Sequence, residues 1–145
     1  MTSTNVRDDQ LPLGAGDAAE VTPRPAASVL LFRRDSLDLL MMRRHEGSSF
    51  VPGAWVFPGG VVEPLDRELT ENELDAIRLC AIRELFEETG IYLGKGLANS
   101  DDSRAALAAG ATTFREVIAT GPVALDQLVL VSHWVTPVGV PKRFD

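Results

Sequence analysis

Hydrophobic positions in the first part of the chain fall into short runs that are separated by turn-forming residues. Two such runs, Ala26–Phe32 and Leu37–Met42, flank an Asp-Ser pair, and this pattern predicts two buried strands that pair as a hairpin. The segment 45–54 contains Gly, Ser and Pro and is expected to form a loop. A third apolar run, 55–62, is interrupted by Pro58-Gly59-Gly60, which indicates a strand that enters a tight backbone feature.

From residue 70 onward the spacing becomes helical. Apolar side chains recur three or four residues apart, which predicts one buried helical face, at Leu74, Ile77, Ala81 and Leu85. Thr70 and Glu73 match the T-x-x-E pattern of a capping box, and Gly90 suits the position that follows a helix C-terminus. Two shorter helices are expected over 101–109 and 113–119, and a strand is expected to start at Leu128 and extend to Val135.

The two ends of the chain lack regular patterning. Residues 1–24 are polar, contain Gly, Pro and Asp, and have little periodicity, so we expect a flexible leader before a domain that spans 25–145. Residues 138–145 carry no helix stop signal and no terminal helix. Because a mixed sheet built from the predicted strands would need more chain, we expect the sequence to be truncated at its C-terminus.

Composition and charge narrow the class of protein. The chain has 145 residues, of which 45% are hydrophobic and 24% charged, as in one ordinary globular domain. The net charge is −7, which disfavours nucleic acid as a partner because a phosphate backbone attracts basic proteins. No apolar stretch approaches the roughly 20 residues of a membrane span. Cys80 is the single cysteine, so no intramolecular disulfide is possible and a cytoplasmic location is expected.

The sharpest chemical feature is the sequence 83–91, Arg-Glu-Leu-Phe-Glu-Glu-Thr-Gly-Ile. On a helix, Glu84, Glu87 and Glu88 share an arc of about 100°, where they repel each other and oppose the helix dipole. A divalent cation would remove this conflict, and hard carboxylate oxygens select Mg²⁺ or Mn²⁺. The alternative is a solvated acidic helix end. The preceding Gly59-Gly60 pair favours the metal interpretation, because glycines let backbone carbonyls approach a metal or a pyrophosphate.

These residues resemble the Nudix box, G-x5-E-x7-R-E-U-x-E-E-x-G-U, in which U is a bulky aliphatic residue. The second half matches at every specified position, namely Arg83, Glu84, Leu85, Glu87, Glu88, Gly90 and Ile91. The first half differs, because Asp66 stands where the family has Glu. In addition, the sixteen residues 67–82 separate Asp66 from Arg83, where the family has seven. We expect the extra nine residues in the loop before the helix, where they leave the carboxylate face intact.

A wider resemblance covers much of the chain. The segments 50–60, 133–137 and 143–145 are similar to a branch of Nudix hydrolases that includes eukaryotic coenzyme A diphosphatases and has a long insertion in the box. This resemblance implies an α+β fold, the Nudix-type α/β/α sandwich with a mixed β-sheet. The sheet is expected to be incomplete here, because that branch continues past Arg-Phe-Asp into another strand. The implied reaction is metal-dependent hydrolysis of the pyrophosphate bond in a nucleoside diphosphate linked to another moiety, with coenzyme A or acyl-coenzyme A favoured.

The resemblance also implies roles for individual residues. Glu87 and Glu88 would hold Mg²⁺ or Mn²⁺, with the carbonyl of Gly59 as a further ligand. Glu84 would be either a metal ligand or the general base, since the family itself varies. Arg83 would orient the carboxylates.

Four residues are candidates for binding the substrate, namely Arg43, Arg44, Phe57 and Gly60. The two arginines follow the second predicted strand and could meet phosphate oxygens, or they could form a solvated strand end. Trp55 and Phe57 alternate with Val56, so one face could stack on a base, although packing in the core is the favoured alternative for both aromatic rings.

The other polar residues receive structural interpretations. We expect Asp66 and Asp75 to be loop and helix-surface charges, Cys80 to be a small apolar filler, His133 to be an ordinary strand histidine, and Arg143 to lie in a frayed chain end. Two other functions stay open: a Nudix domain that binds a nucleotide without hydrolysing it, and an inactive fragment of a longer enzyme. The expected partner is a small nucleoside diphosphate derivative, and both a monomer and a homodimer are compatible with the sequence.

Overall fold

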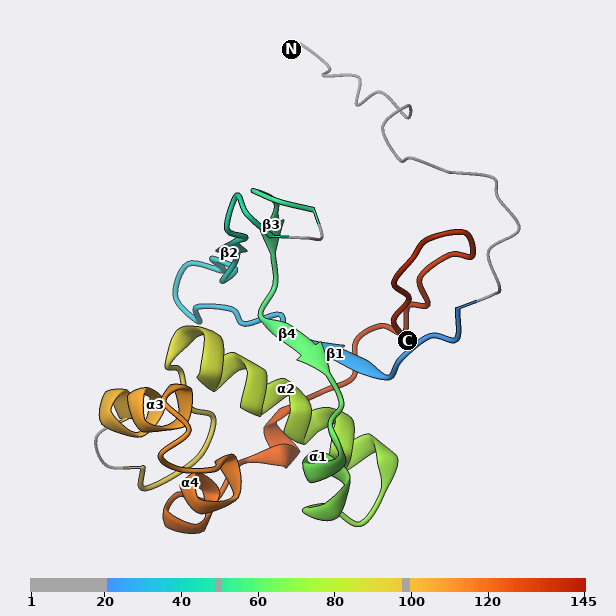
Figure 1. Cartoon of the computed structure of the whole chain (residues 1–145). Helices are drawn as coiled ribbons and strands as arrows, with labels where there is room; N and C mark the ends of the chain where they lie inside the picture. The colour runs from blue at the N-terminus through green and yellow to red at the C-terminus, as the bar shows by residue number, and fades with distance from the viewer. Residues whose placement is uncertain (1–20, 49–50, 98–99) are drawn as a thin grey trace.

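The computed structural model describes residues 21–48, 51–97 and 100–145 (Figure 1). Residues 1–20 of the expected leader, two residues of the expected 45–54 loop, and residues 98–99 lie outside this description. The elements follow in the order β1 (Ala26–Ser28), β2 (Met42–Arg43), β3 (Trp55–Val56), β4 (Gly59–Val61), α1 (Pro64–Glu68), α2 (Glu73–Thr89), α3 (Ser100–Ala108), α4 (Phe114–Thr120) and a 3₁₀ helix (Leu125–Gln127).

The strands form two small antiparallel sheets. β1 pairs with β4, with Ala27 opposite Gly60, and β2 pairs with β3. The expected hairpin between 26–32 and 37–42 forms only in part: the Leu40 N–H donates to the Leu31 carbonyl at 2.9 Å, but β1 itself pairs with β4. Glycine explains this preference, because a Cβ at Gly59 would lie only 2.2 Å from the carbonyl oxygen of Ala27.

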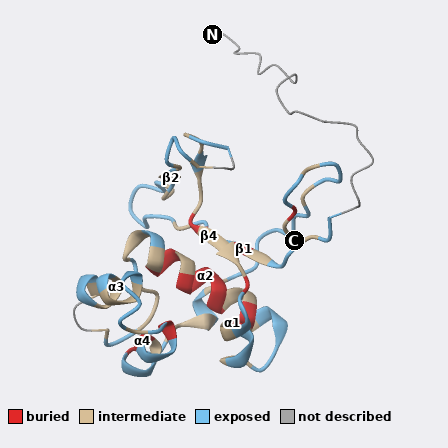
Figure 2. Cartoon of the chain, viewed as in Figure 1, coloured by how far each residue is buried: buried red, intermediate tan, exposed pale blue. Residues whose placement is uncertain are grey.

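Helix α2 is the central element, and it is buried on two sides (Figure 2). One side packs on β1 and β4 through an apolar cluster of Ala27, Val29, Val62, Ala76, Cys80, Ala81 and Leu85. The other side packs on α4 through a second cluster of Leu79, Ile82, Phe86, Phe114 and Val117. The β1–β4 sheet, α2 and α4 thus pack in successive layers. This is the α+β architecture that was expected.

The two ends of α2 differ in how well the sequence predicts them. Gly90 ends the helix in the left-handed conformation at φ 78°, as expected. The start is different, because Asn72 is the N-cap and its side chain accepts from the Asp75 N–H at 3.0 Å. The hydroxyl of Thr70 instead donates to the Asp66 carbonyl at 2.8 Å, which belongs to α1, a helix that was not predicted. The capping box at Thr70 was therefore wrong.

The C-terminal segment is the main departure from the expected architecture. The described residues 128–135 form no strand, and their apolar side chains Val129, Leu130, Val131, Trp134 and Val135 are exposed. Arg143 is buried rather than frayed, because its guanidinium donates to the carbonyls of Thr136 at 3.1 Å and Val21 at 2.8 Å. His133 is exposed and contacts the Asp145 carboxylate.

One backbone pairing joins the two ends of the described chain. Arg24 and Phe144 form an isolated parallel bridge, and the Ala26 N–H donates to the Asp145 carbonyl at 2.7 Å. Figure 1 shows the chain end beside the start of β1. Within the described residues, no helix is both long enough and apolar enough to cross a membrane.

Candidate active site

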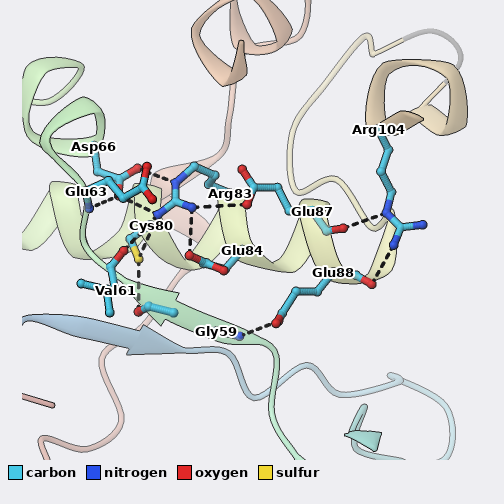
Figure 3. A network of polar contacts seen from close by, with 11 residues as sticks. Gly59, Val61, Glu63, Asp66, Cys80, Arg83, Glu84, Glu87, Glu88 and Arg104 are labelled. Atoms are coloured by element: carbon cyan, nitrogen blue, oxygen red, sulfur yellow. Dashed lines mark hydrogen bonds and ion pairs between the residues drawn. The ribbon is translucent and has the colours of Figure 1, made fainter. Parts of the chain in front are cut away.

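Arg83 lies at the centre of a polar network between α1, α2 and β4 (Figure 3). Only 3% of the residue is exposed. Its Nε and Nη2 donate to the two carboxylate oxygens of Asp66, each at 3.0 Å, and its Nη1 donates to Glu84 at 2.8 Å and to Glu87 at 3.4 Å. Burial alone would lower the pKa of Arg83, but the hydrogen bonds and charge of Asp66 outweigh it and raise that pKa. A cation fixed in this way orients the two glutamates beside it.

Asp66 is a site residue that sequence reasoning missed. It was expected to be a loop charge, yet it is fully buried in α1 and makes the bidentate ion pair with Arg83. Its Oδ2 also accepts from the N–H of Glu63 at 2.8 Å, which completes a capping box at the start of α1. The signal that could have identified it is its place after Gly60 with five residues between them, where the box has its first acidic residue. Asp75, by contrast, lies on the helix surface as expected, paired with Arg78.

Gly60 makes room for Glu84. A Cβ on Gly60 would lie 2.3 Å from the carboxyl carbon of Glu84, so any larger residue would displace that carboxylate. The carbonyl of Gly60 faces Cys80, whose thiol donates to it at 3.5 Å. Burial raises the pKa of the Cys80 thiol to about 12, so the buried thiol stays neutral and acts as a filler, as expected. Gly60 therefore lies beneath a carboxylate rather than in the pocket described below.

Glu87 and Glu88 complete the acidic face of α2. The pKa of each is raised, first because burial removes water from around the carboxylate and then because of the neighbouring Glu84 charge. Arg83 lowers the pKa of Glu87 in part, and a hydrogen bond of 2.9 Å from the Gly59 N–H does the same for Glu88. Burial and the Glu84 charge therefore disfavour the ionised forms of Glu87 and Glu88, and the nearby arginine and backbone groups offset this only in part.

A pocket of about 260 Å³ opens beside this face. Its lining joins the β2–β3 sheet to the start of β4 and the end of α2, through Met42, Arg43, Arg44, Val56, Phe57, Gly59 and Glu88. Three of the four candidate substrate residues thus meet two of the candidate metal ligands. The prediction that Trp55 packs in the core is wrong. The residue is 64% exposed, because it lies on the outward face of a two-stranded sheet. Phe57 is half-buried and faces the pocket.

Arg104 is a second residue that sequence reasoning missed. It lies on α3, and its guanidinium donates to the main-chain carbonyls of Glu87 at 2.8 Å and Glu88 at 3.0 Å (Figure 3). A positive charge is favourable at a helix C-terminus. α2 has no basic residue in its last turn, so Arg104 of α3 supplies this charge. No local pattern in the sequence identifies this contact.

The donor set at this helix end fits a hard divalent cation in its chemistry. Glu84, Glu87 and Glu88 supply only carboxylate oxygens. Burial, and after it the Glu84 charge, raises the pKa values of the last two, and a bound cation would favour their ionised forms. Among the described residues, no three His, Cys, Asp or Glu side chains converge closely enough to hold an ion as they stand. Glu84 is engaged by Arg83 and Glu88 by the Gly59 N–H, so these contacts would have to change on metal binding.

Two curated proteins resemble this chain over most of its length. A Caenorhabditis elegans protein that carries the name nudix hydrolase 7 is 34% identical over 128 residues, covering 83% of this chain and 41% of its own. The acyl-coenzyme A diphosphatase NUDT19 of Gallus gallus is 29% identical over 193 residues, covering 90% of this chain and 50% of its own. The chain thus spans about half the length of the curated relatives that it matches.

A solved structure and a family comparison agree with this similarity. The crystal structure of a NUDIX hydrolase from Alicyclobacillus acidocaldarius matches with a TM-score of 0.73 and 27% identity, covering 88% of this chain and 68% of that chain. The sequence model of the NUDIX domain matches residues 22–119, which include both Gly59-Gly60 and the acidic face of α2. The chain therefore belongs to the NUDIX domain family.

Proposed function

We propose that this protein hydrolyses the pyrophosphate bond of a nucleoside diphosphate linked to another moiety, with Mg²⁺ or Mn²⁺ as cofactor. The observation that carries the proposal is the pocket in which Arg43, Arg44 and Phe57 meet Gly59 and Glu88. Cationic side chains suit phosphate oxygens and an aromatic ring suits a base. Such a pocket beside the carboxylates of α2 supports a site in which phosphate binding would lie next to metal binding.

The favoured substrate is coenzyme A or acyl-coenzyme A. Support comes from the similarity to the Gallus gallus acyl-coenzyme A diphosphatase and from the arrangement of the pocket. The pocket lies at the end of α2 and its walls include Met42 and Val56, so a diphosphate could lie by the arginines while an apolar portion contacts these side chains. The free and buried thiol of Cys80 is consistent with a cytoplasmic location, which belongs to the same proposal.

The resemblance to the Nudix box, together with the contacts of Arg83, supports the following roles for the chain's own residues. Glu87 and Glu88 would hold the metal with the carbonyl of Gly59 as a further ligand, and the metal, when bound, would neutralise charge on the diphosphate. Arg83, anchored by Asp66, orients Glu84 and Glu87. Glu84 is a metal ligand or accepts the proton of the attacking water.

Product analysis by mass spectrometry tests the proposal. The folded chain is incubated with Mg²⁺ or Mn²⁺ and separately with coenzyme A, acyl-coenzyme A, ADP-ribose and NADH, beside a Glu87→Gln/Glu88→Gln variant. We expect metal-dependent cleavage at the diphosphate, fastest with a coenzyme A derivative and absent from the variant. Cleavage that is fastest with ADP-ribose or NADH would overturn the substrate assignment, and equal cleavage by the variant would overturn the assigned carboxylate roles.

A further inference from the structure

The last turn of α2 ends with main-chain carbonyls that the helix itself cannot satisfy. The final four carbonyls of a helix lack intrahelical donors. The Gly90 N–H donates to the Phe86 carbonyl at 2.8 Å, and the Ile91 N–H donates to the Thr89 hydroxyl. Within the described chain, no main-chain N–H donates to the carbonyls of Glu87 or Glu88. These two carbonyls belong to the residues that carry the proposed metal-binding carboxylates.

Arg104 satisfies both carbonyls at once. Its Nε donates to the Glu87 carbonyl at 2.8 Å and its Nη2 to the Glu88 carbonyl at 3.0 Å. The planar guanidinium has a fixed fork of donors, so these two bonds fix the spacing of the two carbonyls. The bond to Glu87 is partly buried, the bond to Glu88 is exposed, and they span 17 and 16 residues of sequence, so α3 holds the end of α2 from outside.

Arg104 and Arg83 therefore hold different groups at this end of α2, and Glu87 is the one residue that contacts both. Arg83 donates to the side chains of Glu84 and Glu87, whereas Arg104 donates to the main chain of Glu87 and Glu88. Figure 3 shows the two guanidiniums separated along α2, with the glutamates between them. If the last turn frayed, the backbone of Glu87 and Glu88 would no longer be fixed, even with the side-chain contacts of Arg83 in place.

We propose that Arg104 is a positioning residue for metal binding, which holds the last turn of α2 so that the Glu87 and Glu88 carboxylates meet one cation. This inference rests on the proposed function. Residues that orient metal ligands from outside typically change metal affinity by about 10- to 100-fold when they are substituted. Arg104→Lys retains the charge but not the fork, and should fall between wild type and Arg104→Gln.

Two readouts on the full chain test this role. Hydrogen exchange of the metal-free protein reports the backbone of 87–90, and direct titration with Mn²⁺ reports metal affinity. In Arg104→Gln we expect faster exchange at 87–90 with unchanged exchange in the middle of α2, together with a Kd for Mn²⁺ raised by about tenfold or more. The control is Arg115→Gln, since Arg115 forms an exposed pair with Glu68, and it should leave both readouts unchanged.

The outcomes separate this inference from the proposed function. Equal Mn²⁺ affinity in wild type and Arg104→Gln would overturn the role of Arg104 alone, as would unchanged exchange at 87–90. A lower melting temperature with unchanged Mn²⁺ affinity would make Arg104 an ordinary helix cap and also overturn it. A wild-type chain that binds no Mn²⁺ would overturn the proposed function itself.

Discussion

Asp66 and Arg83 form a buried bidentate ion pair that joins α1 to the acidic face of α2. Both Asp66 oxygens accept from the guanidinium at 3.0 Å, and neither side chain is more than 4% exposed. The same guanidinium orients Glu84 and Glu87. The first half of the box is thus joined to the second by direct contact, because Asp66 of α1 anchors the central arginine.

Removing Asp66 should cost stability as well as activity. Asp66→Ala leaves the buried Arg83 without its main partner, and breaking a buried pair from one side typically costs about 3–5 kcal/mol. Glu68→Ala is the matched control, because it removes an exposed pair with Arg115, for which about 0–1 kcal/mol is typical. Urea unfolding of the two variants measures the difference. Equal losses in the two variants would mean that the Asp66–Arg83 pair is not a specific anchor.

The adjacent glycines should separate activity from stability. In Gly60→Ala the new methyl meets the end of the Glu84 side chain at 2.3 Å, which can rotate away, so we expect a fold close to wild type and a strongly reduced kcat. In Gly59→Ala the new methyl meets the carbonyl oxygen of Ala27 at 2.2 Å. Because this backbone atom cannot rotate away, we expect a stability loss of roughly 1–3 kcal/mol. Thermal unfolding and turnover of both variants check this. A Gly60→Ala variant with wild-type kcat contradicts the placement of Glu84.

The raised pKa values of Glu87 and Glu88 predict a pH dependence with a definite sign. A carboxyl whose pKa is raised by folding binds more protons in the folded state, so its contribution to stability falls as pH rises above its ordinary pKa of 4.5. Other carboxyls such as Glu73, whose pKa is lowered, act in the opposite direction. The Glu87→Gln/Glu88→Gln variant isolates the pH dependence that these two carboxyls cause, because it removes their titration and leaves that of the other carboxyls in place.

We therefore expect this double variant to gain stability relative to wild type as pH increases from about 4 upward, in the absence of divalent metal. Adding Mn²⁺ should reverse the order at neutral pH, since metal binding favours the ionised carboxylates of the wild type. Denaturant unfolding at several pH values, with Mn²⁺ and with a chelator, measures both effects. A stability difference that does not change with pH contradicts the assigned burial of these carboxylates.

Arg44 should affect substrate binding more than chemistry. It lines the pocket near Glu88, and its charge lowers the pKa of that carboxyl. A cation that contacts the diphosphate equally in the ground and transition states changes KM rather than kcat. We expect Arg44→Met to raise KM about tenfold or more with a smaller change in kcat. Arg33→Met is the matched control, because Arg33 pairs with Asp38 on an exposed turn, and it should leave both constants unchanged.

The sequence pattern predicted α2 and its C-terminal end because both depend on residues that are close together in the sequence. The spacing of Ala81 and Leu85 defines a buried face, and Gly90 ends the helix in the left-handed conformation. The helix start was harder, since Thr70 and Asn72 are both good N-cap residues. Tertiary contact decides between them, because the Thr70 hydroxyl is already bonded to the Asp66 carbonyl.

The parts that the sequence did not predict depend on distant contacts. The burial of Asp66 requires a partner 17 residues away, and the cap from Arg104 requires α3 to lie against the end of α2. Neither follows from periodicity. The expected strand over 128–135 depends on pairing in the same way, and this apolar run forms no strand and is largely exposed.

The most direct test of the account is metal-dependent turnover of a coenzyme A derivative by three forms of the full chain. These are wild type, Glu87→Gln, and Glu71→Gln, which alters an exposed glutamate outside the site. The account predicts Mn²⁺-dependent cleavage by wild type and Glu71→Gln, and a loss of at least about 100-fold in Glu87→Gln with the fold retained. Turnover by Glu87→Gln equal to that of Glu71→Gln would contradict the central claim that the carboxylates of α2 hold the catalytic metal.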